Sequence, residues 1–395
     1  MRVPKLVVRP VMLLVPVLLA GAVAETAPAV PASAARTRSR DTLASVPIPG
    51  QFNAVMATSP GNAWAVGYSP GETLIERWNG TAWKFVPSLG LGASGDLYGV
   101  AATSASNAWA VGYLPGQTGT GSLIAHWNGK TWKRVASPNP GPNGSILQGV
   151  AATSASNAWA VGETGGEKTV ILRWNGTGWK RVPSPSPGPE GSFLYGVSAI
   201  SARSAWAVGY ADNGGISTTL VLHWNGTAWK QVPSPSPPVG SILYGVTATS
   251  ATNAWAVGYT AVYSEGWKTL ILHWNGTTWK HVPSPNPVTV SSSTLTWNIL
   301  QSVAATSGPN AWAVGYSEEA LKGSKTMILH WNGTSWKQVA SPNPFCATCD
   351  SLYGVTATSA SNAWAVGTLN VGGEVVILRW NGTTWKNFPS APSPG

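Results

Sequence analysis

Residues 243–259 read LYGVTATSATNAWAVGY, and residues 269–285 read TLILHWNGTTWKHVPSP. Six further copies of this two-part phrase occur along the 395-residue chain. The first tryptophans of the seven copies are Trp64, Trp109, Trp159, Trp206, Trp255, Trp312 and Trp364. Their spacings of 45 to 57 residues indicate an architecture in which one supersecondary unit is repeated.

Each copy contains four short strand-like runs, as at residues 97–103, 108–113, 270–274 and 279–282. An Asn-Gly pair between the third and fourth runs predicts a two-residue type I′ hairpin. The small residues of the first run suit a crowded axis, and the tryptophans suit wide gaps between sheets. Ring closure removes open sheet edges, so residues 51–395 are expected to form an all-β, seven-bladed β-propeller of four-stranded antiparallel blades.

The phrases AWAVGY and HWNGTxW…VPSP resemble the Trp-rich repeats of uncharacterised secreted bacterial β-propeller proteins. They are more distantly similar to kelch and galactose-oxidase-like blades. Kelch blades usually carry a Gly pair after the second strand, whereas a single Gly stands here, so that second similarity is architectural only. The resemblance spans all seven copies and implies a fold, a bacterial source and secretion, but no particular activity.

The N-terminal sequence predicts export. Residues 1–24 combine the basic residues Arg2, Lys5 and Arg9 with an apolar run and a small-residue cleavage pattern, which is typical of a signal peptide. Cleavage is expected after Ala24 or Ala34. Residues 25–50 are rich in Ala, Pro and Arg without periodicity and are interpreted as a flexible leader. The mature chain should therefore be extracellular, with no membrane span.

The charge of the chain follows the repeats. Only 10% of the residues are charged, and the net charge of +10 falls to +7 when Arg2, Lys5 and Arg9 are removed with residues 1–24. A lysine follows the third tryptophan of every copy, on the run expected to be outermost. This placement indicates a solvated rim that discourages edge association, and argues against a nucleic-acid surface.

The sequence contains no convincing catalytic constellation. A glycosidase generally needs two positioned carboxylates, and none of the 14 acidic residues of this chain recurs at a fixed repeat position. The Asp-box of sialidase-like propellers would place Asp where Trp78, Trp127 and Trp174 stand. We therefore expect a non-catalytic protein without cofactor or metal, with a carbohydrate-active enzyme as a less favoured hypothesis.

One basic position recurs directly before the second tryptophan. It is always Arg or His, which suggests stacking between blades, with a basic ring for a polyanion as the alternative. The residues are Arg77, His126, Arg173, His223, His273, His330 and Arg379.

The only two cysteines are Cys346 and Cys349, in the stretch between the sixth and seventh copies. A local disulfide is expected after export, because a thioredoxin-like site would need a βαβ context and a zinc site would need two more ligands.

The connections between the second and third runs, and between copies, vary in length and content, and antiparallel geometry places them together on one face of the ring. Function is expected on this variable face, with Tyr263, Trp267 and Trp297 as candidate ligand-binding residues. The two tryptophans are the only ones outside the repeat pattern, and packing beneath their own loops is the alternative. We expect a monomer that binds a glycan or cell-envelope polymer, or alternatively serves as a protein-interaction scaffold.

Overall fold

The computed structural model describes residues 49–88, 91, 95–116, 119–141, 143–237, 239–262, 266–288, 295–320, 322–342, 350–369 and 373–391. The predicted signal peptide, nearly all of the leader, Tyr263, Cys346 and Cys349 lie outside these residues. Every regular element within the described ranges is a β-strand, and none of the described segments is a helix that could cross a membrane.

Each copy of the phrase, here called a repeat, forms four consecutive strands. The first strands are β1 (Gln51–Ser59), β5 (Asp96–Ser104), β9 (Ser145–Ser154), β13 (Gly191–Ser201), β17 (Ser241–Ser250), β21 (Thr296–Ser307) and β25 (Ser351–Ser359). The second strands are β2 (Asn62–Ser69), β6 (Asn107–Gly116), β10 (Asn157–Thr164), β14 (Ser204–Asp212), β18 (Asn253–Val262), β22 (Asn310–Glu319) and β26 (Asn362–Leu369).

The third and fourth strands carry the second half of the phrase. The third strands are β3 (Glu72–Trp78), β7 (Gly119–Trp127), β11 (Thr169–Trp174), β15 (Ser217–Trp224), β19 (Gly266–Trp274), β23 (Gly323–Trp331) and β27 (Glu374–Trp380). The short fourth strands are β4 (Trp83–Phe85), β8 (Trp132–Arg134), β12 (Trp179–Arg181), β16 (Trp229–Gln231), β20 (Trp279–His281), β24 (Trp336–Val339) and β28 (Trp385–Asn387).

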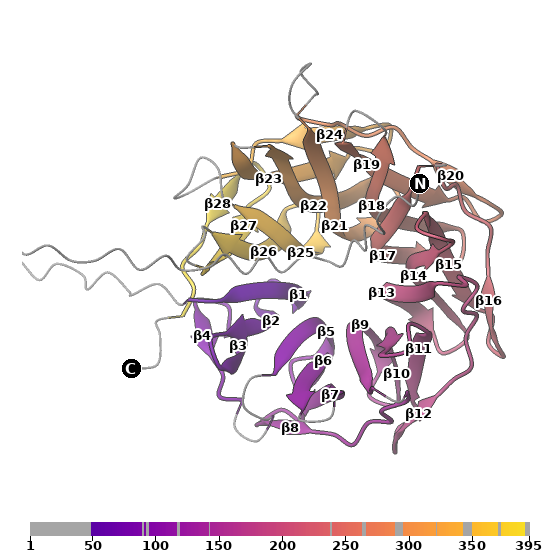
Figure 1. Cartoon of the computed structure of the whole chain (residues 1–395). Helices are drawn as coiled ribbons and strands as arrows, with labels where there is room; N and C mark the ends of the chain where they lie inside the picture. Colours follow the sequence, from indigo (N-terminus) through magenta and orange to yellow (C-terminus); the bar gives the residue numbers. More distant parts are fainter. Residues whose placement is uncertain are drawn as a thin grey trace, which may run out of the picture. The chain divides into compact units, whose positions relative to one another are not determined.

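The four strands of a repeat pair with one another in chain order, and every such pair is antiparallel. Among the described residues this produces five four-stranded sheets and one eight-stranded sheet, β17–β24. The larger sheet arises where β19 and β21 pair in parallel at Gly266↔Thr296 and Trp267↔Trp297. The first strands adjoin one another in a closed circuit, β1, β5, β9, β13, β17, β21, β25 and back to β1, so the fold is a β-propeller (Figure 1).

The Asn-Gly connection differs from the predicted two-residue hairpin. Trp174 pairs with Trp179, which leaves a four-residue loop at residues 175–178. Of the Asn-Gly pair only the glycine has a positive φ, 99° at Gly176, whereas a type I′ turn needs both. Instead, the Oδ1 atom of Asn175 accepts hydrogen bonds of 3.0 Å from the backbone N–H groups of Thr177 and Gly178. The asparagine is therefore used for its side-chain acceptor, which closes the loop as an Asx turn.

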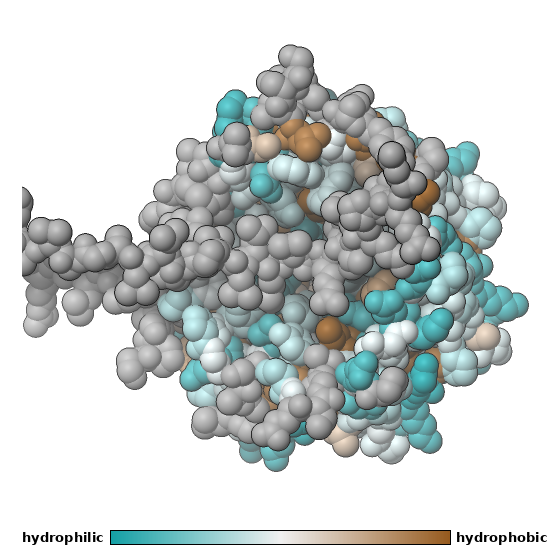
Figure 2. Space-filling model, viewed as in Figure 1, coloured by the Kyte–Doolittle hydropathy of each residue, from teal (hydrophilic) through white to brown (hydrophobic). Residues whose placement is uncertain are grey.

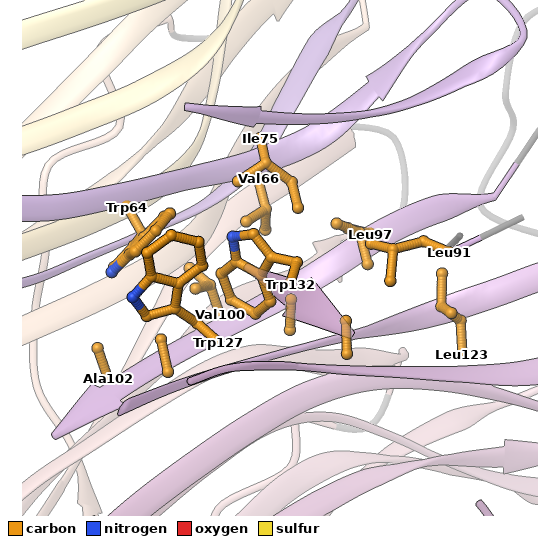
Figure 3. Close-up of a cluster of buried hydrophobic side chains, with 13 residues drawn as sticks. Trp64, Val66, Ile75, Leu91, Leu97, Val100, Ala102, Leu123, Trp127 and Trp132 are labelled. Atoms are coloured by element: carbon orange, nitrogen blue, oxygen red, sulfur yellow. The ribbon is translucent and has the colours of Figure 1, made fainter. Parts of the chain in front are cut away.

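Tryptophan rings fill the spaces between neighbouring repeats, as predicted. The buried Trp64 of the first repeat lies 5.0 Å from Trp127 and 5.1 Å from Trp132 of the second, with interplanar angles of 60° and 82°. Figure 3 shows these three rings beside the aliphatic side chains of Val66 and Val100. The same triad recurs between later repeats. Aromatic pairs of this kind contribute about 0.5–1.5 kcal/mol each beyond area burial.

Both ends of the described chain reach across the junction between the first and last repeats. Pro49 forms a β-bridge with Glu374, and the backbone N–H of Gly50 donates to the carbonyl oxygen of Gly373. In the other direction, the ring of Phe388 lies 5.1 Å from that of Trp78, at an angle of 87°. These contacts join the two ends of the repeat array without any strand being exchanged between sheets.

Candidate functional site

The structure brings two of the three predicted site residues together. Trp267 on β19 and Trp297 on β21 are paired across the parallel bridge, and their half-buried rings lie 6.3 Å apart at 71°. Trp267 also stacks on Tyr259 of β18, with 4.4 Å between ring centroids. The two tryptophans therefore do more than pack beneath their own loops, because they join two repeats and extend a larger group of aromatic side chains.

That larger group is called the aromatic cluster below. Its members come from the beginnings of first strands, the ends of second strands and the beginning of β19, all of which lie on the variable face. Phe193 stacks on Tyr210 at 4.7 Å, and Tyr195 contacts Tyr244 of the next repeat at 5.1 Å. The members are Phe193, Tyr195, Tyr210, Ile242, Tyr244, Tyr259, Trp267, Trp297, Ile299 and Tyr316.

A second arrangement surrounds the axis. In every repeat two residues of the first strand are passed over in the register with the second strand, as in β-bulges, and the one nearer the start of the strand is called the bulge residue below. The side chain of this bulge residue can reach the next repeat, as Asn53 does when its Nδ2 atom donates to the carbonyl oxygen of Leu97 at 2.8 Å. The bulge residues are Asn53, Tyr98, Gln148, Tyr195, Tyr244, Gln301 and Tyr353, all uncharged hydrogen-bonding groups.

The glycine that ends the phrase AWAVG makes this arrangement possible. A Cβ atom at Gly258 would lie 1.9 Å from the carbonyl oxygen of Ile242, just before the bulge residue Tyr244. The strands approach too closely there for any side chain, and the equivalent glycines of the other repeats are equally crowded. The single Gly of the phrase is therefore needed for the close pairing of the first and second strands beside the bulge.

Three carboxyl groups, those of Asp96, Glu163 and Glu318, lie near tyrosines of the bulge positions and of the second strands. Burial raises the pKa of each carboxyl group. The Asp96 carboxylate accepts hydrogen bonds from the hydroxyls of Tyr113 and Tyr98, which oppose the effect of burial without overcoming it. Burial raises the pKa of Glu318, and it also raises the pKa of Tyr316, to which the charges of Tyr353 and Glu318 add a smaller effect. Burial raises the pKa of Glu163 to about 8.

Glu163 is the most unusual of the three. The Nε2 atom of Gln148 donates to its Oε1 atom at 3.3 Å. Its Oε2 atom is buried and has no hydrogen-bond partner in the described part of the chain. Neither Gln148 nor Glu163 was among the predicted site residues, because those were expected in the variable loops, whereas these two residues stand on β9 and β10. Comparison of each repeat position would have found them.

The recurring Arg and His side chains lie at the other end of the sheets, on the Asn-Gly face, and have packing partners. The guanidinium carbon of Arg77 lies 5.1 Å from the ring centroid of Trp64, and its Nη2 atom donates to Asn62 Oδ1 at 2.9 Å. His273 is 2.8 Å from the Oδ1 atom of Asn253. Burial lowers the pKa of four of the histidines, His126, His223, His273 and His330, below 6.5, which disfavours their charged form at neutral pH. These contacts favour stacking over a basic ring for a polyanion.

The described surface offers no other strong candidate. Two shallow depressions of about 440 and 220 Å³ lie at the outer ends of sheets, one lined by Ser122, Arg134 and Asn139 and the other by Ser341, Pro342 and Trp385. Neither contains a predicted site residue. No group of three His, Cys, Asp or Glu side chains that could hold a metal ion is found within the described ranges. Figure 2 shows small apolar areas interspersed with polar ones on the coloured part of the face in view.

No protein-family profile matches this chain, and no curated protein matches its sequence. Its fold resembles that of several solved structures. YCF48 from Cyanidioschyzon merolae is 14% identical, with a TM-score of 0.52 over 85% of this chain and 97% of that chain. A structure of YCF48 bound to D1 peptide gives the same identity and TM-score, over 85% and 93%. The BP39L lectin from Burkholderia pseudomallei is 12% identical, with a TM-score of 0.54 over 86% and 99%. At such identities the likeness shows a shared β-propeller fold.

Proposed function

We propose that this chain is a secreted, non-catalytic carbohydrate-binding protein that recognises a glycan or cell-envelope polymer through the aromatic cluster. The observation that carries the proposal is the composition of that cluster. Tyr and Trp rings can stack on the apolar face of a sugar, while hydroxyl, amide and carboxyl groups beside them bind its hydroxyls. The fold likeness to the BP39L lectin is consistent with this use of a propeller.

We also propose that the ring has seven blades and acts as a monomer. The closed circuit of seven first strands supports this count, with the eight-stranded sheet taken as two blades joined by the two residue pairs between β19 and β21.

The proposed export of the protein is supported by the signal-peptide pattern of residues 1–24. N-terminal sequencing of the mature protein from the culture medium would test it, and an intact Met1 on a membrane-bound product would contradict it.

The proposed function is tested with a printed glycan array and the mature protein. Replacement of both Trp267 and Trp297 by Ala should abolish binding, while circular dichroism should show a retained β-fold. The matched control replaces His273 and His330 by Ala on the opposite face, and should bind as the unaltered chain does. Loss of binding in this control alone, with strong salt dependence, would favour the basic ring instead.

A protein-interaction scaffold is the second candidate. One specific observation favours it, namely that a propeller of the same fold, YCF48, has been solved with a bound D1 peptide. A peptide library examined beside the glycan array separates the two. Binding to peptides and to no glycan would support the scaffold and exclude the carbohydrate proposal.

A further inference from the structure

The third repeat alone combines a glutamine at the bulge position with a glutamate after the AWAVG phrase. The residue after the AWAVG phrase is Tyr68, Tyr113, Tyr210, Tyr259 and Tyr316 in five repeats and Thr368 in the seventh, but Glu163 in the third. The bulge residue is tyrosine in the second, fourth, fifth and seventh repeats, Asn53 in the first, Gln301 in the sixth and Gln148 in the third. The fold accepts Tyr at both positions elsewhere, so it does not itself require this Gln–Glu pair.

The pair is costly to the folded state. A buried polar atom without a hydrogen-bond partner destabilises a protein by about 1–3 kcal/mol, and Glu163 Oε2 is such an atom. Its oxygens cannot both be satisfied by Gln148, which donates to Oε1 alone. Tyrosine, which other repeats carry at both positions, would avoid this cost. A residue that weakens the fold although such an alternative exists is expected to bind a ligand.

Bulge tyrosines of both adjoining repeats stand on the strands next to the pair. A Cβ atom at Gly99, which follows Tyr98 of the second repeat, would lie 3.1 Å from the carbonyl oxygen of Gln148, and one at Gly149 would lie 2.6 Å from the carbonyl oxygen of Tyr195 of the fourth. Phe193, which is stacked on Tyr210, lies near the start of β13, and β13 adjoins β9. The pair therefore places polar groups beside the partly buried rings of Phe193 and Tyr195 in the aromatic cluster, and proteins commonly orient a small ligand by such a combination.

We propose that Gln148 and Glu163 are the polar anchor of the glycan site, and that they bind two neighbouring hydroxyl groups of an uncharged sugar beside Phe193 and Tyr195. This inference rests on the proposed function. An uncharged sugar is favoured over an acidic one because Asp96, Glu163 and Glu318 all lie among the tyrosines, and an ionised sugar carboxylate would be repelled by any of them that ionises. At neutral pH a proton on the Glu163 carboxyl, whose pKa burial raises to about 8, lets it both donate and accept hydrogen bonds.

The chain offers an internal control for the test. Glu163→Tyr and Gln148→Tyr each restore the residue that other repeats carry, so both variants should fold with an equal or higher melting temperature. Glu163→Gln keeps the shape and one acceptor. The matched control is Gln301→Tyr, because Gln301 is also a bulge residue but has Tyr316 in the place of Glu163.

The mature variants are compared on an array of neutral, amino-substituted and acidic glycans, and by calorimetry with the methyl glycosides of fucose, galactose, glucose and mannose. We expect the unaltered chain to bind neutral glycans. Affinity should fall by about tenfold or more in Glu163→Tyr and Gln148→Tyr and by less in Glu163→Gln, and it should change less than about twofold in Gln301→Tyr.

The outcomes separate the two proposals. Glycan binding that survives unchanged in Glu163→Tyr overturns the anchor and leaves the proposed function standing. Stronger binding to acidic or amino-substituted glycans than to neutral ones overturns the ligand class. If the unaltered chain binds no glycan on the array, the proposed function fails and the anchor fails with it.

Discussion

The backbone N–H of Ala391 donates a 3.1 Å hydrogen bond to the Oε2 atom of Glu76, and this contact joins the last repeat to the first. Both residues are buried, and both depart from the repeat pattern. The position of Glu76 is apolar in the other repeats, and the position of Ala391 is proline in five of them, which has no N–H to donate. The apolar residues are Ala125, Leu172, Leu222, Leu272, Leu329 and Leu378, and the prolines are Pro138, Pro185, Pro235, Pro285 and Pro342.

A polar contact found at one junction and not at its equivalents can direct how the ring closes. Because the seven repeats present similar tryptophan triads, packing alone hardly favours the first repeat over any other repeat as the neighbour of the last one. An unpaired Glu76 would be costly against any surface that lacks a donor at the position of Ala391. The seam between the first and last repeats is thus specified by a carboxyl and an amide, in addition to the contacts of Phe388.

We predict that Glu76 makes the stability of the protein depend on pH. Burial raises its pKa from 4.5 to about 8, against the opposing effect of the Ala391 hydrogen bond. The folded state therefore holds this proton more tightly than the unfolded state, and stability is lost as pH rises from about 5 to 8. The slope for one such group is at most about 1.4 kcal/mol per pH unit.

Urea unfolding at pH 5, 6.5 and 8 measures this dependence. Glu76→Gln keeps an acceptor for Ala391 and should flatten the fall in the free energy of unfolding between pH 5 and 8. Because Glu163 also has a pKa raised to about 8, Glu163→Gln should flatten a second share of the fall. The exposed Glu72→Gln is the control and should leave the slope unchanged. A Glu76→Gln slope identical to that of the unaltered chain would refute the prediction.

The strands were predictable from the sequence because their determinants are local and repeated. The run at 108–113 lies within β6 and the run at 270–274 within β19. The Asn-Gly loop was not predicted correctly, because the same dipeptide serves both a type I′ turn and an Asx-closed loop of four residues. Neither the Glu76–Ala391 seam nor the Gln148–Glu163 pair was predicted. The seam depends on a contact between the first and last repeats, whereas Gln148 and Glu163 meet across the neighbouring strands β9 and β10 of one repeat. Each of the two combinations of residues occurs in only one repeat.

We predict that Asn275→Ala destabilises the protein by about 1 kcal/mol. The Oδ1 atom of Asn275 accepts hydrogen bonds from the backbone N–H groups of Thr277 and Thr278, at 3.0 and 2.9 Å. Asn275→Asp keeps this acceptor and should cost less than Asn275→Ala. Thermal unfolding of both variants provides the measurement. Equal losses in the two variants would show that the side-chain acceptor does not hold the loop closed.

We predict that Gly258→Ala is among the most damaging single substitutions in the repeat. The added methyl group would lie 1.9 Å from the carbonyl oxygen of Ile242, and both strands are buried here, so the backbone would have to shift. A loss of about 3 kcal/mol or more in the free energy of unfolding is expected. The control is Gly308→Ala, where a Cβ atom would meet nothing within 4 Å and φ is not positive. Its stability should change by less than about 1 kcal/mol, and a similar loss in both variants would contradict the close approach of the strands.

Deletion of one whole repeat tests whether the sheets form a closed ring. Ile242 and Ile299 occupy equivalent positions before a leucine, so removal of residues 243–299 joins Ile242 to Leu300 without changing the phrase. In a ring, the remaining sheets must either close at altered angles or leave the junction of Glu76, Ala391 and Phe388 unpaired. We therefore expect a large drop in melting temperature and a broadened calorimetric transition. A linear array would lose one unit and its interfaces, and would still unfold in a sharp transition at a similar temperature. A six-repeat chain that is as stable as the unaltered protein would therefore contradict the prediction. It would show that the stability of the fold does not depend on a ring closed by all of the repeats.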